Sequence, residues 1–174
     1  MKRITDRSAR GRIRRAFSLI EVAVAIAIIS LGLVALLTAI RAGTNSNNAG
    51  RQITQAAFLA REIRVWTLKL PFSDPDPGDQ GNPPGPDGSD PQVFVDDLDD
   101  LMGVTYDPPR DGTGSPIANM VGWTQTITIT WRDPDSLTTI VPAGSTDAAM
   151  VQLDIACRGQ TVLTTSWIVV RRQE

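Results

Sequence analysis

The sequence predicts an α+β protein in which one long N-terminal helix packs on a small antiparallel sheet. Three observations lead to this prediction: an unbroken apolar run, a following stretch with apolar residues at every third or fourth position, and alternating apolar and polar residues in the C-terminal third. The 174 residues leave room for one modest globular domain beside an extended element. We expect five segments, over residues 1–16, 17–40, 41–70, 71–92 and 93–174.

The first segment, residues 1–16, is a basic leader. It holds seven of the 17 Lys and Arg residues and one acid, Asp6. Because the whole chain has a formal net charge of −2, everything after the leader is clearly acidic. Binding to nucleic acid relies on a basic patch on the folded domain. We therefore expect no nucleic-acid partner.

The apolar run over residues 17–40 is long enough to cross a membrane. It contains one charged residue, Glu21, and no proline. As a helix it would be about 36 Å long, against about 30 Å for a bilayer core. The basic residues are concentrated before the run, so the positive-inside rule keeps the leader in the cytoplasm and sends the chain after Ile40 across the membrane. A secretory signal peptide cut after Ala42 is an alternative, although the run is long for one.

Glu21 is the unusual residue of this run. A carboxylate within a membrane helix costs at least about 2.5 kcal/mol, so it predicts a functional role and needs a partner. The run has no Lys or Arg. Cleavage before Phe17 would create an α-amino group about one helical turn from Glu21, and that amine is a suitable counter-ion. The alternative is an ordinary membrane anchor in which Glu21 has no role.

The basic leader, Ala16, and the sequence FSLIEV with the apolar run after it resemble the prepilin-type signal of type IV pilins, type II secretion pseudopilins and competence pilins. The resemblance is specific over residues 14–37, and its run EVAVAIAIISLGLVALL is closest to V-type minor pilins and I-type minor pseudopilins. It implies a pilin-like fold, cleavage between Ala16 and Phe17, N-methylation of Phe17 and an assembly role for Glu21. Ala16 departs from the glycine that the family prefers.

The resemblance also implies partners and a location. The partners are a prepilin peptidase, which cuts on the cytoplasmic side, other pilin or pseudopilin subunits, and inner-membrane lipid before assembly. The chain would span the bacterial inner membrane once, with its C-terminal head in the periplasm, and then enter a filament. Whether that filament is a secretion pseudopilus, a type IV pilus or a DNA-uptake system stays open.

Residues 41–70 continue the helix beyond the membrane. Apolar residues recur there at spacings of three and four and form one stripe, which predicts a face packed on a sheet. Pro71 stops the helix. The stripe consists of Ile53, Ala56, Ala57, Ala60, Ile63, Trp66, Thr67 and Leu70.

Residues 71–92 are rich in Pro, Gly and Asp and predict a loop without regular structure. The short spacing of their aspartates is also typical of calcium loops, because Ca²⁺ collects six to eight oxygen ligands. A solvated loop is favoured over calcium binding, since no EF-hand pattern is present. The weak calcium candidates are Asp74, Asp76, Asp79, Asp87 and Asp90.

The C-terminal third predicts three antiparallel strands. Residues 123–131 alternate between threonines and larger residues, and residues 151–157 and 161–170 alternate in the same way. Residues 132–135 are expected to form a turn. The acidic stretch 96–100 predicts a short helical turn that docks Leu98 and Leu101 on the core.

The composition argues against an enzyme. The chain has no histidine, which removes the most common general base and zinc ligand. We therefore predict a structural filament subunit without a cofactor or catalytic residues. The alternative function is an adhesin-like or ligand-binding tip subunit that displays its head, in which case the variable 71–119 region would carry the binding site.

Overall fold

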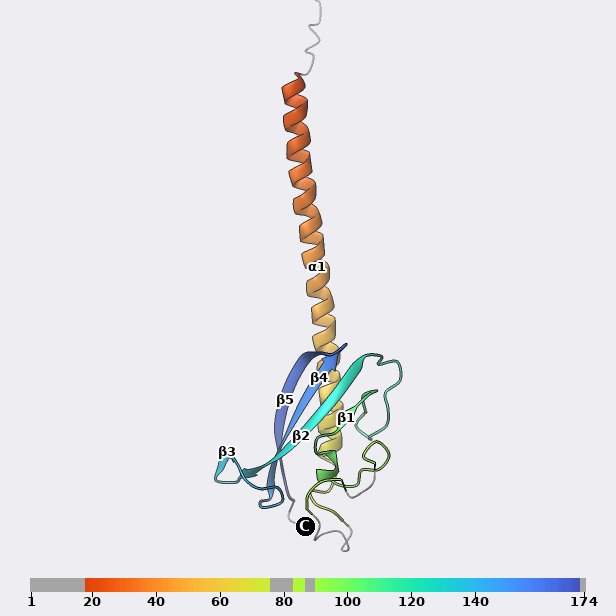
Figure 1. The fold of residues 1–174 in the computed structure, drawn as a ribbon, viewed down its shortest axis with the longest axis vertical. Coiled ribbons are helices and arrows are strands. Elements are labelled where there is room, and N and C mark those ends of the chain that lie inside the picture. The colour runs from red at the N-terminus through yellow and green to blue at the C-terminus, as the bar shows by residue number, and fades with distance from the viewer. Residues whose placement is uncertain (1–17, 76–82, 87–89, 173–174) are drawn as a thin grey trace, which may run out of the picture. The chain divides into compact units, whose positions relative to one another are not determined.

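The computed structural model describes residues 18–75, 83–86 and 90–172, and its order of elements is shown in Figure 1. The chain divides into two compact units, Met1–Ser46 and Asn47–Glu174. Helix α1 (Leu19–Thr67) has 49 residues and runs from the first unit into the second. The predicted combination of one long helix with an antiparallel sheet is confirmed.

The C-terminal part of α1 belongs to the second unit and supplies the helical side of its core. Its six buried residues are Ala56, Leu59, Ala60, Ile63, Trp66 and Thr67. The predicted stripe is right at five of these positions. It missed Leu59, which completes the three- and four-residue spacing from Ala56 to Ile63. Ile53 and Ala57 were wrongly included, since both are exposed.

The sheet is antiparallel throughout. Its strand order is β1-β2-β4-β5, and β3 pairs with the far end of β2 as an additional hairpin (Figure 1). Strand β5 therefore forms one edge of the sheet. The strands are β1 (Thr105–Tyr106), β2 (Trp123–Asp133), β3 (Ser136–Ile140), β4 (Ala148–Cys157) and β5 (Gln160–Val170).

The alternation expected in the three long strands is confirmed. In β2 the odd-numbered residues from Trp123 to Trp131 are buried, and the threonines between them are half-buried or exposed. The helix-facing sides of β4 and β5 contribute further buried residues, among them Leu153 and Trp167. Strands β1 and β3 were not predicted, because β1 has two residues and every residue of β3 is exposed, so neither shows an alternating pattern.

Gln125 is a polar member of the buried face of β2, and its amide is fully bonded to the backbone. Its Nε2 donates to the carbonyl oxygens of Leu59 at 3.1 Å and Arg110 at 3.2 Å, and its Oε1 accepts from the Arg110 N–H at 2.6 Å. Burial of an amide is tolerated only when its hydrogen bonds are made. Gln125 thus connects the sheet, the helix and the loop before β2.

The connection between α1 and the sheet behaves as the sequence predicts. The described residues between 71 and 92 form no helix or strand. The acidic stretch that follows contains the short 3₁₀ helix η1 (Asp99–Leu101), and both Leu98 and Leu101 are fully buried. The turn expected at 132–135 begins two residues later, at Pro134, because Arg132 and Asp133 still belong to β2.

Candidate functional site

The N-terminal part of α1, residues 19–40, leaves all of its large apolar side chains exposed. Its most apolar 18-residue window has a mean hydropathy of 2.7, and none of that window is buried. The helix is therefore long and apolar enough to cross a membrane. These exposed residues are Leu19, Ile20, Val22, Val24, Ile26, Ile28, Ile29, Leu31, Leu33, Val34, Leu36, Leu37 and Ile40.

The hydroxyl groups in this segment are paired within the helix itself. Ser30 Oγ donates to the Ile26 carbonyl at 2.7 Å, and Thr38 Oγ1 donates to the Val34 carbonyl at 2.9 Å. Such bonds to the carbonyl four residues earlier let hydroxyl groups enter an apolar environment without an unpaired donor. The segment can therefore be covered by lipid or by other helices without loss of a polar contact at these two positions.

Glu21 lies in the first turn of α1, where the positive end of the helix dipole favours a carboxylate. Ser18 and Glu21 have the spacing of a capping box, in which the glutamate would bond back to the Ser18 N–H. Within the described residues, however, the Glu21 side chain makes neither that bond nor an ion pair, and only its backbone N–H is held, by the Ser18 carbonyl at 3.0 Å.

The next cation along the described helix is Arg41. At ~1.5 Å rise per residue, Arg41, twenty positions after Glu21, lies about 30 Å from it along the helix. A counter-ion for Glu21 must therefore come from the chain before Ser18 or from another molecule. The cleavage-site residues Ala16 and Phe17 lie outside the described residues, so their roles stay predictions.

The calcium candidates also stay a prediction. Asp76, Asp79 and Asp87 lie outside the described residues. Asp90 uses its Oδ1 to accept the Gln92 N–H at 2.9 Å, as in an ordinary turn. Among the described residues, no group of three or more acidic, His or Cys side chains is arranged to hold a metal ion.

The acidic turn at residues 96–100 contains a buried carboxyl group that sequence reasoning did not identify. Asp97 is fully buried, and its Oδ1 accepts the backbone N–H groups of Asp99 at 2.8 Å and Asp100 at 3.2 Å. Burial raises the pKa of Asp97 to about 7, and it also raises the pKa values of Asp96 and Asp99. The Asp97 carboxyl group holds the turn that docks Leu98 on the core.

Comparison with known protein families gives a match on the N-terminal segment. Residues 11–37 match the family model of the prokaryotic N-terminal methylation motif, the prepilin-type signal of type IV pilins and pseudopilins. No curated protein and no solved structure gives a significant match to the chain. Proteins with this motif are structural pilin subunits and not enzymes, which confirms the prediction of a non-enzymatic role.

Proposed function

We propose that this chain, which carries the prepilin-type methylation motif, is a minor subunit of a type IV pilus-like or type II secretion filament. The observation that carries the proposal is the combination of an apolar helical surface that is exposed throughout with one carboxylate, Glu21, in its first turn. The apolar surface fits membrane lipid before assembly and the packed helices of a filament core after it.

The motif explains why the chain is made with a leader. Cleavage between Ala16 and Phe17 would remove seven cations, which otherwise hold the N-terminus on the cytoplasmic side of the membrane. The same cut would create the amine of Phe17. That amine, methylated or not, is a cation near the start of a helix that contains no other cation before Arg41.

Glu21 would then act in assembly. In the membrane, the mature chain would hold the Glu21 carboxylate close to its own Phe17 amine. In the filament, the carboxylate would pair with the Phe17 amine of a neighbouring subunit and set the axial register between the two helices. Selection of one register is the best-attested use of ionic groups buried in an apolar interface.

The arrangement of charge supports the proposed orientation. Seven basic residues stand directly before the apolar run, whereas the ten after it are spread over the rest of the chain, so residues 1–16 would stay in the cytoplasm and the unit from Asn47 onward would lie in the periplasm. The proposed partners are a prepilin peptidase, inner-membrane lipid and the other subunits of the filament.

Mass spectrometry of the mature N-terminus tests this function. The chain is expressed in a bacterium that has a prepilin peptidase, and we expect a mature protein that begins with N-methylated Phe17. A chain that keeps Met1, or one cut after Ala42, would contradict the proposal. Ala16→Gly provides the matched control, because it restores the family's preferred residue and should be processed at least as completely.

A further inference from the structure

From Leu163 onward, the edge strand β5 lacks the features that usually protect a sheet edge. Natural edge strands carry Lys, Pro or bulges, which prevent pairing with another strand. Strand β5 has 11 residues, QTVLTTSWIVV, with no charged residue and no proline. A bulge at Val162 interrupts its N-terminal end, and its register with β4 is regular from Leu163 to Val170. This part of β5 is suited to accept a further strand.

The register shows which backbone groups of β5 are free for such pairing. The Arg171 N–H donates to the Asp147 carbonyl at 2.9 Å, on the β4 side. In an antiparallel pair, every second residue bonds to the neighbouring strand and the residues between point away from it. The N–H and C=O groups of Thr164, Ser166, Ile168 and Val170 therefore face the open edge, and no backbone bond to them is made there by the described residues.

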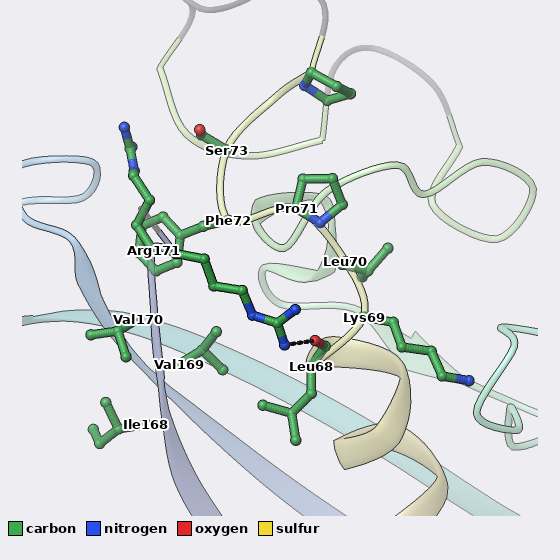
Figure 2. Close-up of a pocket in the computed structure, with 12 residues that line it drawn as sticks. Leu68, Lys69, Leu70, Pro71, Phe72, Ser73, Ile168, Val169, Val170 and Arg171 are labelled. Atoms are coloured by element: carbon green, nitrogen blue, oxygen red, sulfur yellow. Dashed lines mark hydrogen bonds between the residues drawn. The ribbon is translucent and has the colours of Figure 1, made fainter. Parts of the chain in front are cut away.

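A groove runs along the C-terminal end of this edge. It has a volume of about 790 Å³ and is lined by two consecutive stretches of chain, residues 168–172 on one side and residues 68–73 with Pro75 on the other. Figure 2 shows Val169 on the side of β5 that faces Leu68, and Ile168 and Val170 on the opposite side of the strand. Because consecutive residues of β5 line the groove, it opens on the backbone edge of the strand as well as on its side chains.

The groove is positively charged in an otherwise acidic unit. Lys69, Arg171 and Arg172 line it, and Arg171 forms an ion pair with Asp147 at 3.1 Å. Within the described part of the chain, Lys69 and Arg172 have no carboxylate within 4.0 Å; they donate to the carbonyl oxygens of Gly112 and Leu68. Lys69 points away from β5 (Figure 2), so the charge that can meet a negatively charged partner at this edge is that of Arg172.

We propose that the groove binds an extended segment of another filament subunit, which adds to β5 as a further strand and places an acidic residue beside Arg172. That the segment belongs to another filament subunit rests on the proposed function. That it is extended and carries an acidic residue rests on the open edge of β5 and on Arg172. Strand addition obtains its affinity from main-chain hydrogen bonds and its specificity from the alternate side chains of the added strand. A second copy of β5 does not meet this description, since it has no acidic residue to offer.

A synthetic peptide tests the binding mode on the full chain in detergent. The probe is a fluorescently labelled peptide with two aspartates followed by alternating threonine and valine, and its anisotropy is measured. We expect saturable binding. Arg172→Glu should weaken it by about tenfold or more, because attraction becomes repulsion. Arg61→Glu makes the same charge change on an exposed residue outside the groove lining and should leave binding unchanged.

N-methylated peptides separate strand addition from simple charge attraction. N-methylation at alternate residues blocks the N–H groups on one edge of a strand and leaves those on the other edge free. N-methylation of one of the two alternate sets of peptide residues should abolish binding. N-methylation of the other set should leave binding intact. Equal binding of both sets, or of a peptide with lysines in place of the aspartates, would overturn the proposal.

Photo-crosslinking in the producing cell identifies the source of the segment. A crosslinking residue at Ser166, on the open edge, should give an adduct with a different filament subunit. The same crosslinking residue placed at Thr128, which is exposed on the outer face of β2, should give no such adduct. No adduct from Ser166, or an adduct that contains only this chain, would overturn the inference. If Phe17 is found methylated in that same protein, the proposed function stands even though the docking site fails.

Discussion

Glu21 and Asp97 differ in the partners that the chain offers to their carboxyl groups. Glu21 stands in an apolar helical segment, and Asp97 is fully buried in the head. The two are distinguished by what surrounds them. Asp97 has backbone N–H groups of its own chain as partners, whereas the described chain provides no partner for the Glu21 side chain. Asp97 is thus suited to hold a turn, and Glu21 to respond to another molecule.

The role of Glu21 can be tested with three substitutions. Glu21→Ala should insert in the membrane normally, because it makes the helix more apolar, but it should fail to enter filaments. Glu21→Asp keeps the charge and shortens its reach, so we expect reduced incorporation. Membrane and filament fractions, compared by immunoblotting, measure both steps. Thr38→Ala is the control in the same helix, and normal incorporation of Glu21→Ala would disprove the mechanism.

Asp97 should make the stability of the head depend on pH. The raised pKa means that Asp97 keeps its proton in the folded head up to about pH 7. In the unfolded chain, the proton is lost near pH 3.8. The folded state binds more protons between these values, so stability falls as pH rises from about 4 to 7. Asp97→Asn keeps the Oδ1 acceptor and should stabilise the head at pH 8 by about 2 kcal/mol.

Urea unfolding followed by tryptophan fluorescence measures this effect, because all four tryptophans lie beyond Asn47. Asp111→Asn is the control of opposite sign. Hydrogen bonds from Thr113 lower the pKa of Asp111 below its usual value, so its contribution is present at neutral pH and is lost as pH falls through that lowered pKa. An unchanged pH slope in Asp97→Asn would show that its carboxyl group is ionised in the folded head.

At the scale of elements, the contact between helix and sheet depends on both apolar packing and Gln125. Gln125→Met preserves most of the side-chain volume but leaves the Arg110 N–H without its acceptor. Loss of a buried polar partner costs about 1 to 3 kcal/mol for each group left unsatisfied. We expect a loss of about 2 to 3 kcal/mol in the free energy of unfolding, measured by urea titration.

The matched control for Gln125 is Gln152→Met. Gln152 lies on β4 with its side chain on the half-buried outer face, where its Nε2 donates to Asp154 Oδ2 at 3.2 Å. Water can replace that bond, so the substitution should cost less than about 1 kcal/mol. Equal effects of the two substitutions would show that the bonds from Gln125 do not stabilise the head.

At the scale of the whole molecule, the buried core belongs entirely to the second unit. Its first member along the chain is Ala56, well after the division at Asn47. A chain that begins at Asn47 should therefore fold without detergent and unfold cooperatively in urea, whereas the full chain should need detergent. Circular dichroism and size-exclusion chromatography test this prediction. Aggregation of the shortened chain would show that residues 1–46 contribute to folding.

The sequence by itself determined the features that arise from local order. The membrane-compatible run, the position of Glu21 and the three long strands are visible in it, because a helix or strand repeats its apolar residues over three to four or two positions. The motif at residues 11–37 is equally local. Even the burial of Leu98 and Leu101 could be predicted, from two leucines within an acidic turn.

Only the tertiary structure decided the strand order, and with it the open edge of β5. The groove joins residues 68–75 to residues 168–172, and Gln125 reaches Leu59 across 66 positions of the sequence. The raised pKa of Asp97 likewise depends on its burial by residues from elsewhere in the fold. These features arise from contacts between residues distant in sequence, and a local repeat carries no information about which elements become neighbours.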